Sequence, residues 1–202
     1  MGALLSLPGR SVYADLAEKT GFSCHQINVL HKRFKQLSQS KDTLRKEDFE
    51  AINDLALNPI RSEIITAFFD RRNFRQSAVG MADEITFEEF LLVMSHFRPP
   101  RLSLTKEQCE SVKREKLRFL FNMHDTDNNG TITTQEYRCV VEELLSHSGP
   151  LEKTVYIADA AMQEVANTAD VEPGGFFAGI TFEHFYKLLS GFDIEHKMSL
   201  RF

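Results

Sequence analysis

The sequence predicts an all-α fold of four helix–loop–helix units, paired into two lobes with short β-ribbons between the paired loops. A polar loop at 125–136 lies between two segments whose apolar residues recur at helical spacing. An aliphatic residue followed five positions later by an aromatic one occurs at four places, which indicates an internal repeat. These pairs are Leu44 and Phe49, Ile85 and Phe90, Ile132 and Tyr137, and Ile180 and Phe185.

The loop 125–136 fits the calcium-binding loop of an EF-hand at each diagnostic position. Calcium prefers six to eight oxygen ligands, and a bidentate glutamate closes the loop at its twelfth position. Gly130 stands where the chain must turn back on itself. The alternative is a solvated acidic turn, which leaves Ile132 and the helical flanks unexplained. The sequence therefore predicts one calcium site, at which magnesium can compete. The predicted ligands are Asp125, Asp127, Asn129, Thr131 and Glu136.

The first unit keeps its helices but not the oxygen ligands of its loop. Ser23 and Gln26 form a capping-box pattern, and apolar residues from Ile27 to Leu37 then mark one face of a helix. The loop 38–43 has one carboxylate, a lysine and no glycine. We therefore expect no metal in this unit.

The second unit also departs from the metal-binding pattern. Its first helix runs from about Ile60 to Phe69, but Asp70 and Glu89 lie twenty positions apart where twelve are needed. The insert carries arginines, which repel a cation, and we expect them in a solvated loop rather than in a phosphate-binding patch. They are Arg71, Arg72 and Arg75.

A proline-containing connector, 97–101, separates the two pairs of units. Thr105 and Gln108 form a second capping-box pattern, and the basic run 113–118 is expected on the outer face of the helix that follows. The fourth unit begins after Pro150 and lacks ligands, since Gly174, Gly175 and His184 occupy ligand positions.

Paired loops place their aliphatic residues opposite each other, so Leu44 should face Ile85, and Ile132 should face Ile180. The predicted organisation is an N-terminal segment at 1–20, a first lobe at 21–98, a linker at 99–104 and a second lobe at 105–202.

Composition restricts the function. The net charge of −5 argues against nucleic acid as the main partner, and no run is long enough to span a bilayer. The three cysteines are widely spaced, which is typical of free thiols. The seven histidines are scattered, and neither a nucleophile–base pattern nor a glycine-rich phosphate loop is present. The sequence therefore predicts no enzyme.

The N-terminus fits the pattern for N-myristoylation, with Gly2 exposed after Met1 is removed and Ser6 at the favoured place. The alternative is that the leucines at 4–7 pack on the first lobe. One myristoyl chain gives marginal membrane binding, so a second attachment is needed. We expect a protein partner to provide it.

Beyond these motifs, the chain resembles the calcineurin B homologous proteins, and most closely a member whose fourth hand is also degenerate. Residues 3–18 and the end at Phe202 depart from that member. The resemblance implies an adaptor for the juxtamembrane cytoplasmic helix of a plasma-membrane sodium/proton exchanger, promoting its maturation, surface stability and activity. It also implies inhibition of calcineurin, and a cytoplasmic, membrane-associated location with the nucleus as an alternative. The likeness is carried by 19–22, 31–38, 57–62, 115–121, 140–146 and 192–195.

An amphipathic target helix needs an apolar groove. With three units without metal, we expect constitutive partner binding that calcium tunes through the second lobe only. The rival interpretation is a calcium buffer, or a sensor for other target helices. The groove candidates, each of which could also be plain core, are Phe90, Val93, Met94, Phe97, Leu188, Leu189 and Phe192.

Overall fold

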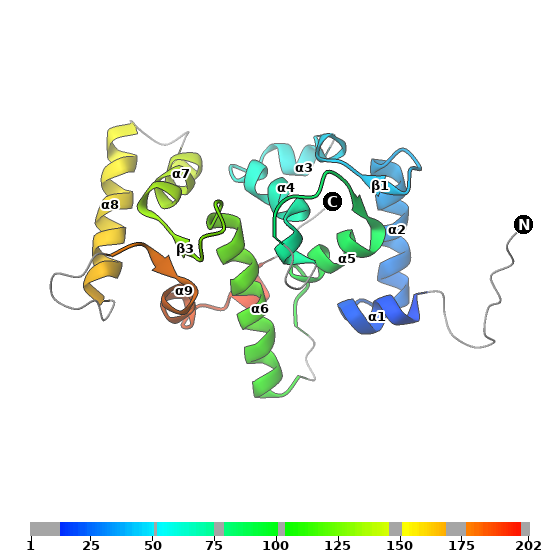
Figure 1. Ribbon diagram of the computed structural model, residues 1–202. Helices are drawn as coiled ribbons and strands as arrows, with labels where there is room; N and C mark the ends of the chain where they lie inside the picture. Colours follow the sequence, from blue (N-terminus) through cyan, green and yellow to red (C-terminus); the bar gives the residue numbers. More distant parts are fainter. Residues whose placement is uncertain are drawn as a thin grey trace, which may run out of the picture.

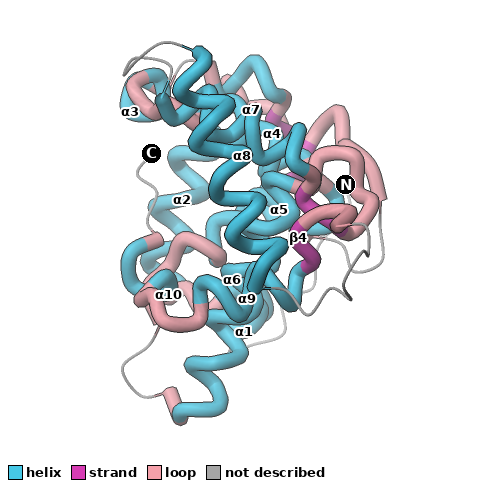
Figure 2. The backbone as a smooth tube through the Cα atoms, turned by 90° about the vertical axis from the view of Figure 1, so that its left-hand side faces the viewer, coloured by secondary structure: helices cyan, strands magenta, loops and turns pink. Residues whose placement is uncertain are grey.

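Two antiparallel ribbons pair the four loops as predicted. Leu44 lies opposite Ile85 in the first ribbon, and Ile132 lies opposite Ile180 in the second. The chain is described by a computed structural model over residues 13–50, 52–74, 79–100, 104–145, 151–168 and 177–198. Helices account for most of the described chain, and the strands are short segments (Figure 2). The all-α fold class is confirmed.

The helices and strands follow the order of the four units (Figure 1). The first two units comprise α1 (Ala14–Thr20), α2 (Cys24–Leu37), β1 (Thr43–Leu44), η1 (Lys46–Phe49), α3 (Asn53–Ala56), α4 (Arg61–Phe69), η2 (Arg71–Asn73), β2 (Ile85–Thr86) and α5 (Phe87–Ser95). The last two units comprise α6 (Lys106–His124), β3 (Thr131–Ile132), α7 (Thr134–Leu145), α8 (Leu151–Thr168), β4 (Ile180–Thr181), α9 (Phe182–Leu189) and α10 (Ile194–Lys197).

Local signals set the helix starts. Ser23 and Gln26 make both hydrogen bonds of a capping box at α2, and Thr105 and Gln108 do so at α6. The second ribbon needs a glycine at its edge: Gly179 has φ +146°, and a Cβ there would lie 2.6 Å from the carbonyl oxygen of Ile132. The capping boxes were predicted, whereas this close approach depends on the pairing.

Helix α6 lies between two hydrophobic cores and contributes to both (Figure 1). Phe119 and Met123 belong to the first core, which is rich in phenylalanine, while Leu117 and Phe121 belong to the second. Residues two apart on a helix point about 200° apart, so these pairs occupy opposite faces of α6. The helix therefore joins the two lobes through packing on both sides.

The basic run of α6 is not confined to the outer face, so that prediction was wrong. Lys113 is 8% exposed and its Nζ donates to the carbonyl oxygen of Ser190, and Lys116 is 2% exposed with its Nζ 2.7 Å from the carbonyl oxygen of Arg98. The buried ammonium groups satisfy backbone carbonyls near the ends of other helices, which compensates for their desolvation.

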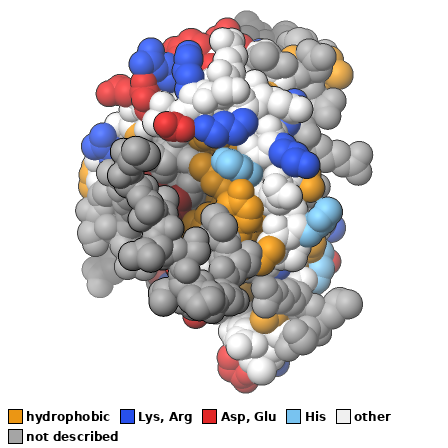
Figure 3. All heavy atoms as spheres, turned by 90° about the vertical axis from the view of Figure 1, so that its right-hand side faces the viewer, with side chains coloured by type: hydrophobic (Ala, Val, Ile, Leu, Met, Phe, Trp, Pro, Cys, Tyr) orange, Lys and Arg blue, Asp and Glu red, His pale blue; other side chains and the backbone are white. Residues whose placement is uncertain are grey.

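The molecule also has an apolar outer surface on the first lobe. Figure 3 shows the side that lies on the right in Figure 1, where hydrophobic side chains gather in the middle of the face among charged ones. Among the described helices, none combines the length and the hydropathy that crossing a membrane requires.

A buried histidine at the junction of the lobes should make the stability depend on pH. Burial lowers the pKa of His96 from 6.5 to about 4, against the hydrogen bond between its Nε2 and the carbonyl oxygen of Asn73. Between those pH values the unfolded chain binds more protons than the folded one, so the free energy of unfolding falls as the pH is lowered. The shift corresponds to roughly 3 kcal/mol.

Urea denaturation between pH 7 and pH 4.5 measures this effect. The variant His96→Phe can still stack on Phe119, whose ring centroid lies 4.7 Å from that of His96, but it cannot take up a proton. We expect its stability to fall less steeply with acid than that of the wild-type protein. Equal slopes in the two proteins would contradict this assignment.

Candidate metal centre

The loop 125–136 is held at both ends by helices. Helix α6 ends at His124, and the N–H of Asp125 still donates to the carbonyl oxygen of Phe121. The chain then turns through Asn128 and Gly130, whose φ angles are +60° and +86°. A glycine adopts such an angle without steric cost, which explains its place in the loop.

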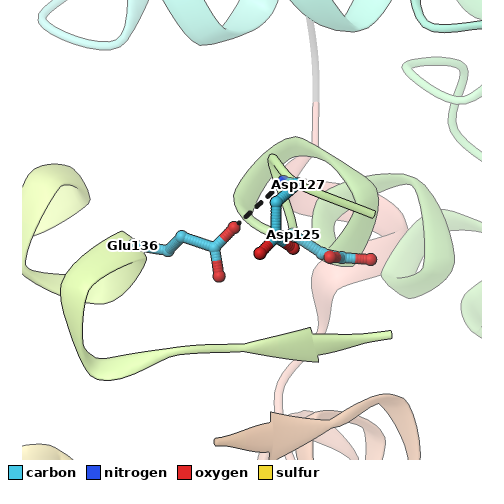
Figure 4. Close-up of side chains that lie close together, drawn as sticks. All are labelled: Asp125, Asp127 and Glu136. Carbon is cyan, nitrogen blue, oxygen red and sulfur yellow. Dashed lines mark hydrogen bonds between the residues drawn. The ribbon is translucent and has the colours of Figure 1, made fainter. Parts of the chain in front are cut away.

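Three carboxylates of this loop lie close together. Asp125, Asp127 and Glu136 each bring one oxygen to within 4.8 Å of the others. Figure 4 shows Glu136 reaching from the start of α7 toward the two aspartates, with its hydrogen bond from the N–H of Asp127. No second group of three such side chains is this close in the part of the chain that the structure describes.

Glu136 is oriented by the first turn of α7. Its Oε2 accepts from the N–H and the hydroxyl of Thr133 at 2.9 and 2.8 Å, and its N–H donates back to Thr133 Oγ1. Its Oε1 accepts from the N–H of Thr126 at 2.7 Å. Burial alone would raise the pKa of Glu136, but the bonds donated by Thr133 and Thr126 outweigh it, and the pKa is lowered. The carboxylate is therefore kept ionised.

Asn129 and Thr131 belong to the same network. The N–H of Asn129 donates to Asp125 Oδ1 and to Asp127 Oδ1, both at 3.0 Å. Asn129 Oδ1 in turn accepts from the N–H and the hydroxyl of Thr131 at 2.8 and 2.6 Å. The five predicted ligands thus share one hydrogen-bonded loop, although their assignment as ligands stays a prediction.

The donor atoms of this network suit a hard cation. The side chains offer carboxylate and amide oxygens, with no sulfur or imidazole among the three clustered residues. Oxygen donors of this kind are those that calcium and magnesium bind. The residues present therefore fit the metal that the loop pattern indicates.

The other loops use their polar side chains for local structure. In the first loop, Lys35 Nζ pairs with Asp42 at 2.8 Å. In the second, Glu89 forms a capping box with Thr86 at the start of α5. In the fourth, the N–H of His184 donates to Thr181 Oγ1, while Gly174 and Gly175 lie outside the described residues.

One residue that contacts the site came from an unexpected place. Arg72 lies in η2, in the second unit, and its Nη1 is 3.0 Å from Asp125 Oδ2. Its side chain is 15% exposed, so the prediction of a solvated arginine was wrong here. Arg71 is also partly buried, and Arg75 lies outside the described residues. Local sequence carries no signal for this contact, because it joins residues of different units.

Asp125 is the most enclosed of the three clustered carboxylates. It is 2% exposed, and burial raises its pKa, with the guanidinium of Arg72 acting in the opposite direction. A buried carboxylate with a cationic neighbour is a strong electrostatic feature. The first ligand position is thus shared between the loop and the second unit.

The predicted groove residues divide between core and surface. Phe90, Val93 and Met94 are buried, so in this structure they serve as core and not as a groove. Phe97 is half-buried against the first core. The remaining three belong to or follow α9: Leu188, Leu189 and Phe192. Leu188 and Phe192 are 44% and 56% exposed.

An apolar cavity of about 190 Å³ lies beside the second ribbon and includes two of these residues. Its lining includes Ile132, Tyr137, Met162, Phe185, Leu188 and Leu189. Because Ile132 belongs to β3, the cavity adjoins the calcium loop. The predicted lipidation site, Gly2, lies outside the described residues.

Comparisons with known proteins extend the similarity beyond the loop. The family model for an EF-hand domain matches residues 116–146. A protein named calcineurin B homologous protein 3 from Homo sapiens is 54% identical over 192 residues, which cover 93% of this chain and 90% of the relative. Its namesake from Gallus gallus is 49% identical, with coverage of 100% and 95%. A protein from Naegleria gruberi, named as the B-type subunit of calcineurin, is 27% identical, with coverage of 93% and 92%.

Proposed function

The chain belongs to the calcineurin B homologous protein family, and from that premise we propose that it is an adaptor for an amphipathic cytoplasmic helix of a membrane sodium/proton exchanger. It is a calcium-binding regulatory EF-hand protein and not an enzyme. As an adaptor it would promote the maturation, surface stability and activity of the exchanger. The observation that carries the proposal is the apolar cavity beside the second ribbon, next to exposed apolar residues of the C-terminal part.

We propose that one calcium ion binds at the loop 125–136. Asp125, Asp127, Asn129 and Glu136 would provide side-chain oxygens, and Thr131 its backbone carbonyl. The ion supplies positive charge at the centre of three carboxylates that otherwise repel one another. The protein's own contribution is to hold Glu136 at the start of α7, where the N–H groups of the loop keep its carboxylate oriented. Three ionised ligands suggest an affinity of about 10⁻⁷–10⁻⁵ M, with magnesium as a competitor.

The cavity fits the apolar side of a helix. Tyr137 and Phe185 provide aromatic walls, and Leu188 adds exposed apolar surface at the rim. An amphipathic helix docks through apolar residues at positions i, i+3, i+4 and i+7, which such a groove can accept. The relative from Naegleria gruberi is named for its place in calcineurin, which supports the calcineurin catalytic chain as a second partner.

Membrane attachment is the third part of the proposal. A myristoyl group on Gly2 would bring the chain to the plasma membrane, and binding to the exchanger would provide the second attachment that stable association requires. The chain would otherwise be cytoplasmic, with the nucleus as a further location. The mass of the N-terminal peptide from expressing cells tests the modification directly.

A peptide titration tests the adaptor function. Calorimetry with a synthetic juxtamembrane helix of a sodium/proton exchanger should show binding that Leu188→Glu weakens at least tenfold, since a charge at the rim must be desolvated. Leu57→Glu is the matched control, because Leu57 is 90% exposed on the first lobe and should leave the affinity unchanged.

Titrations with calcium and with a chelator complete the design. Binding in both conditions, tighter with calcium, supports an adaptor that calcium tunes. Absence of peptide binding while the chain still takes up calcium would instead favour a calcium buffer or a sensor for other target helices.

A further inference from the structure

Arg72 is the centre of a polar seam between the second unit and the calcium loop. Its Nη1 lies 3.0 Å from Asp125 Oδ2 and 2.8 Å from Asn128 Oδ1. Its Nη2 lies 2.9 Å from the carbonyl oxygens of both Asn122 and Asp125. The guanidinium thus contacts the end of α6 and the first turn of the loop from a residue more than fifty positions earlier in the chain.

The second unit orients this guanidinium. Asp70, 6% exposed, accepts from Arg72 Nε at 2.9 Å and from Arg72 Nη2 at 2.7 Å through Oδ2. Asn73 extends the seam, since its Oδ1 accepts from Asn122 Nδ2 at 3.0 Å. A planar guanidinium with two fixed anchors cannot shift its charge as freely as a lysine could. The charge therefore stays beside Asp125.

We propose that Arg72 sets the calcium affinity of the loop and couples that site to the degenerate second hand. The inference deepens the proposed function and rests on calcium binding at 125–136. A cation on Asp125 must share this carboxylate with a guanidinium that already neutralises part of its charge. Two positive groups on one carboxylate repel each other, so Arg72 stabilises the metal-free loop and weakens calcium binding.

The same contacts carry the calcium signal into the first lobe. Calcium weakens the attraction between Arg72 and Asp125, and Arg72 is also bonded to Asp70 at the end of α4. A cavity of about 230 Å³ adjoins the guanidinium and is lined by both lobes, with Glu63, Met81 and Asp127 among its walls. This space lets the side chain change its position without separating the lobes. The second hand, which binds no metal itself, thus responds to calcium at the third.

Calcium titration of the full chain by calorimetry tests the affinity. Arg72→Met keeps the unbranched apolar stem and removes the charge, and we expect its Kd for calcium to fall about tenfold. The matched control is Arg71→Met, which removes one charge from the same turn. No hydrogen bond joins the Arg71 side chain to the calcium loop among the described residues, so its Kd should change less than twofold. Arg72→Lys, which keeps a charge, should stay within threefold of the wild-type value.

Hydrogen exchange provides a second readout that does not depend on the absolute affinity. In the wild-type chain, calcium should change the exchange rates of amides in 61–74 at least threefold, and in Arg72→Met it should not. An unchanged or weaker affinity in Arg72→Met, equal effects of the two methionine variants, or an equal response of 61–74 in both proteins would overturn the inference. Absence of calcium uptake by the wild-type chain would instead refute the proposed function. If Arg72→Met does not fold, the comparison of Arg72→Lys with Arg71→Met in 61–74 decides the matter: a retained calcium response in both supports coupling, and its absence in the wild type overturns it.

Discussion

Glu136→Gln is expected to weaken calcium binding at least a hundredfold and to abolish the stabilisation of the fold by calcium. Both oxygens of Glu136 lie toward the loop, held by Thr126 and Thr133. An amide keeps one oxygen and turns a donor toward the N–H groups of Thr126 and Asp127, which cannot accept it. Because bound calcium stabilises the native state by RT ln(1 + [L]/Kd), a calcium concentration of 100 Kd adds about 2.7 kcal/mol, and the variant should lose nearly all of it.

Thermal unfolding with calcium and with a chelator measures this loss, and calorimetry gives the Kd. Glu142→Gln is the control, since Glu142 lies on α7 beyond the loop and its variant should retain the calcium-dependent rise in Tm. A Glu136→Gln protein that still gains stability at calcium concentrations near the wild-type Kd would show that the metal binds elsewhere.

Phe68→Ala should reduce the free energy of unfolding by about 3–5 kcal/mol, the largest stability effect expected of a single substitution here. Phe68 is 0% exposed, and its ring stacks on those of Phe90 and Phe97 with centroids 5.7 and 6.3 Å apart. It also meets Phe49 at 4.9 Å. Truncation removes these contacts and leaves a cavity among rigid rings, which cannot collapse to fill it.

Urea denaturation followed by circular dichroism gives the change in unfolding free energy. Leu57→Ala serves as the control, because that side chain is 90% exposed and its truncation should change the stability by less than about 0.5 kcal/mol. A loss below about 1 kcal/mol for Phe68→Ala would contradict a tightly packed first core.

Short-range sequence patterns were enough to predict much of this fold. The capping boxes at Ser23 and Thr105 depend on residues three positions apart, so they can be recognised without tertiary structure. The strand register follows from the repeat itself: pairing aliphatic residues of neighbouring units places Leu44 opposite Ile85 and Ile132 opposite Ile180. The clustering of the loop carboxylates is equally local, since it depends on twelve consecutive residues.

Residues that act between units were misjudged from the sequence. The groove candidates Phe90, Val93 and Met94 have the same helical spacing as surface residues of a groove, but they are buried within the first core. Spacing identifies an apolar face and does not tell whether another helix occupies it. Lys113 and Lys116 were likewise assigned to a solvated face, because the carbonyl groups that they satisfy lie far away in the chain.

Three features of this protein follow from the order of its residues alone: the repeat, the register of the ribbons and the loop that brings three carboxylates together. Each depends on residues close in the chain or on a repeated spacing. The three-dimensional fold was needed to show which apolar faces remain open and which charges meet. Arg72 shows the difference most clearly: in the sequence it disqualifies its own loop as a cation site, whereas in the fold its charge lies against the first carboxylate of another unit. The energy of such a contact depends on distance in space and on burial, and neither is encoded locally.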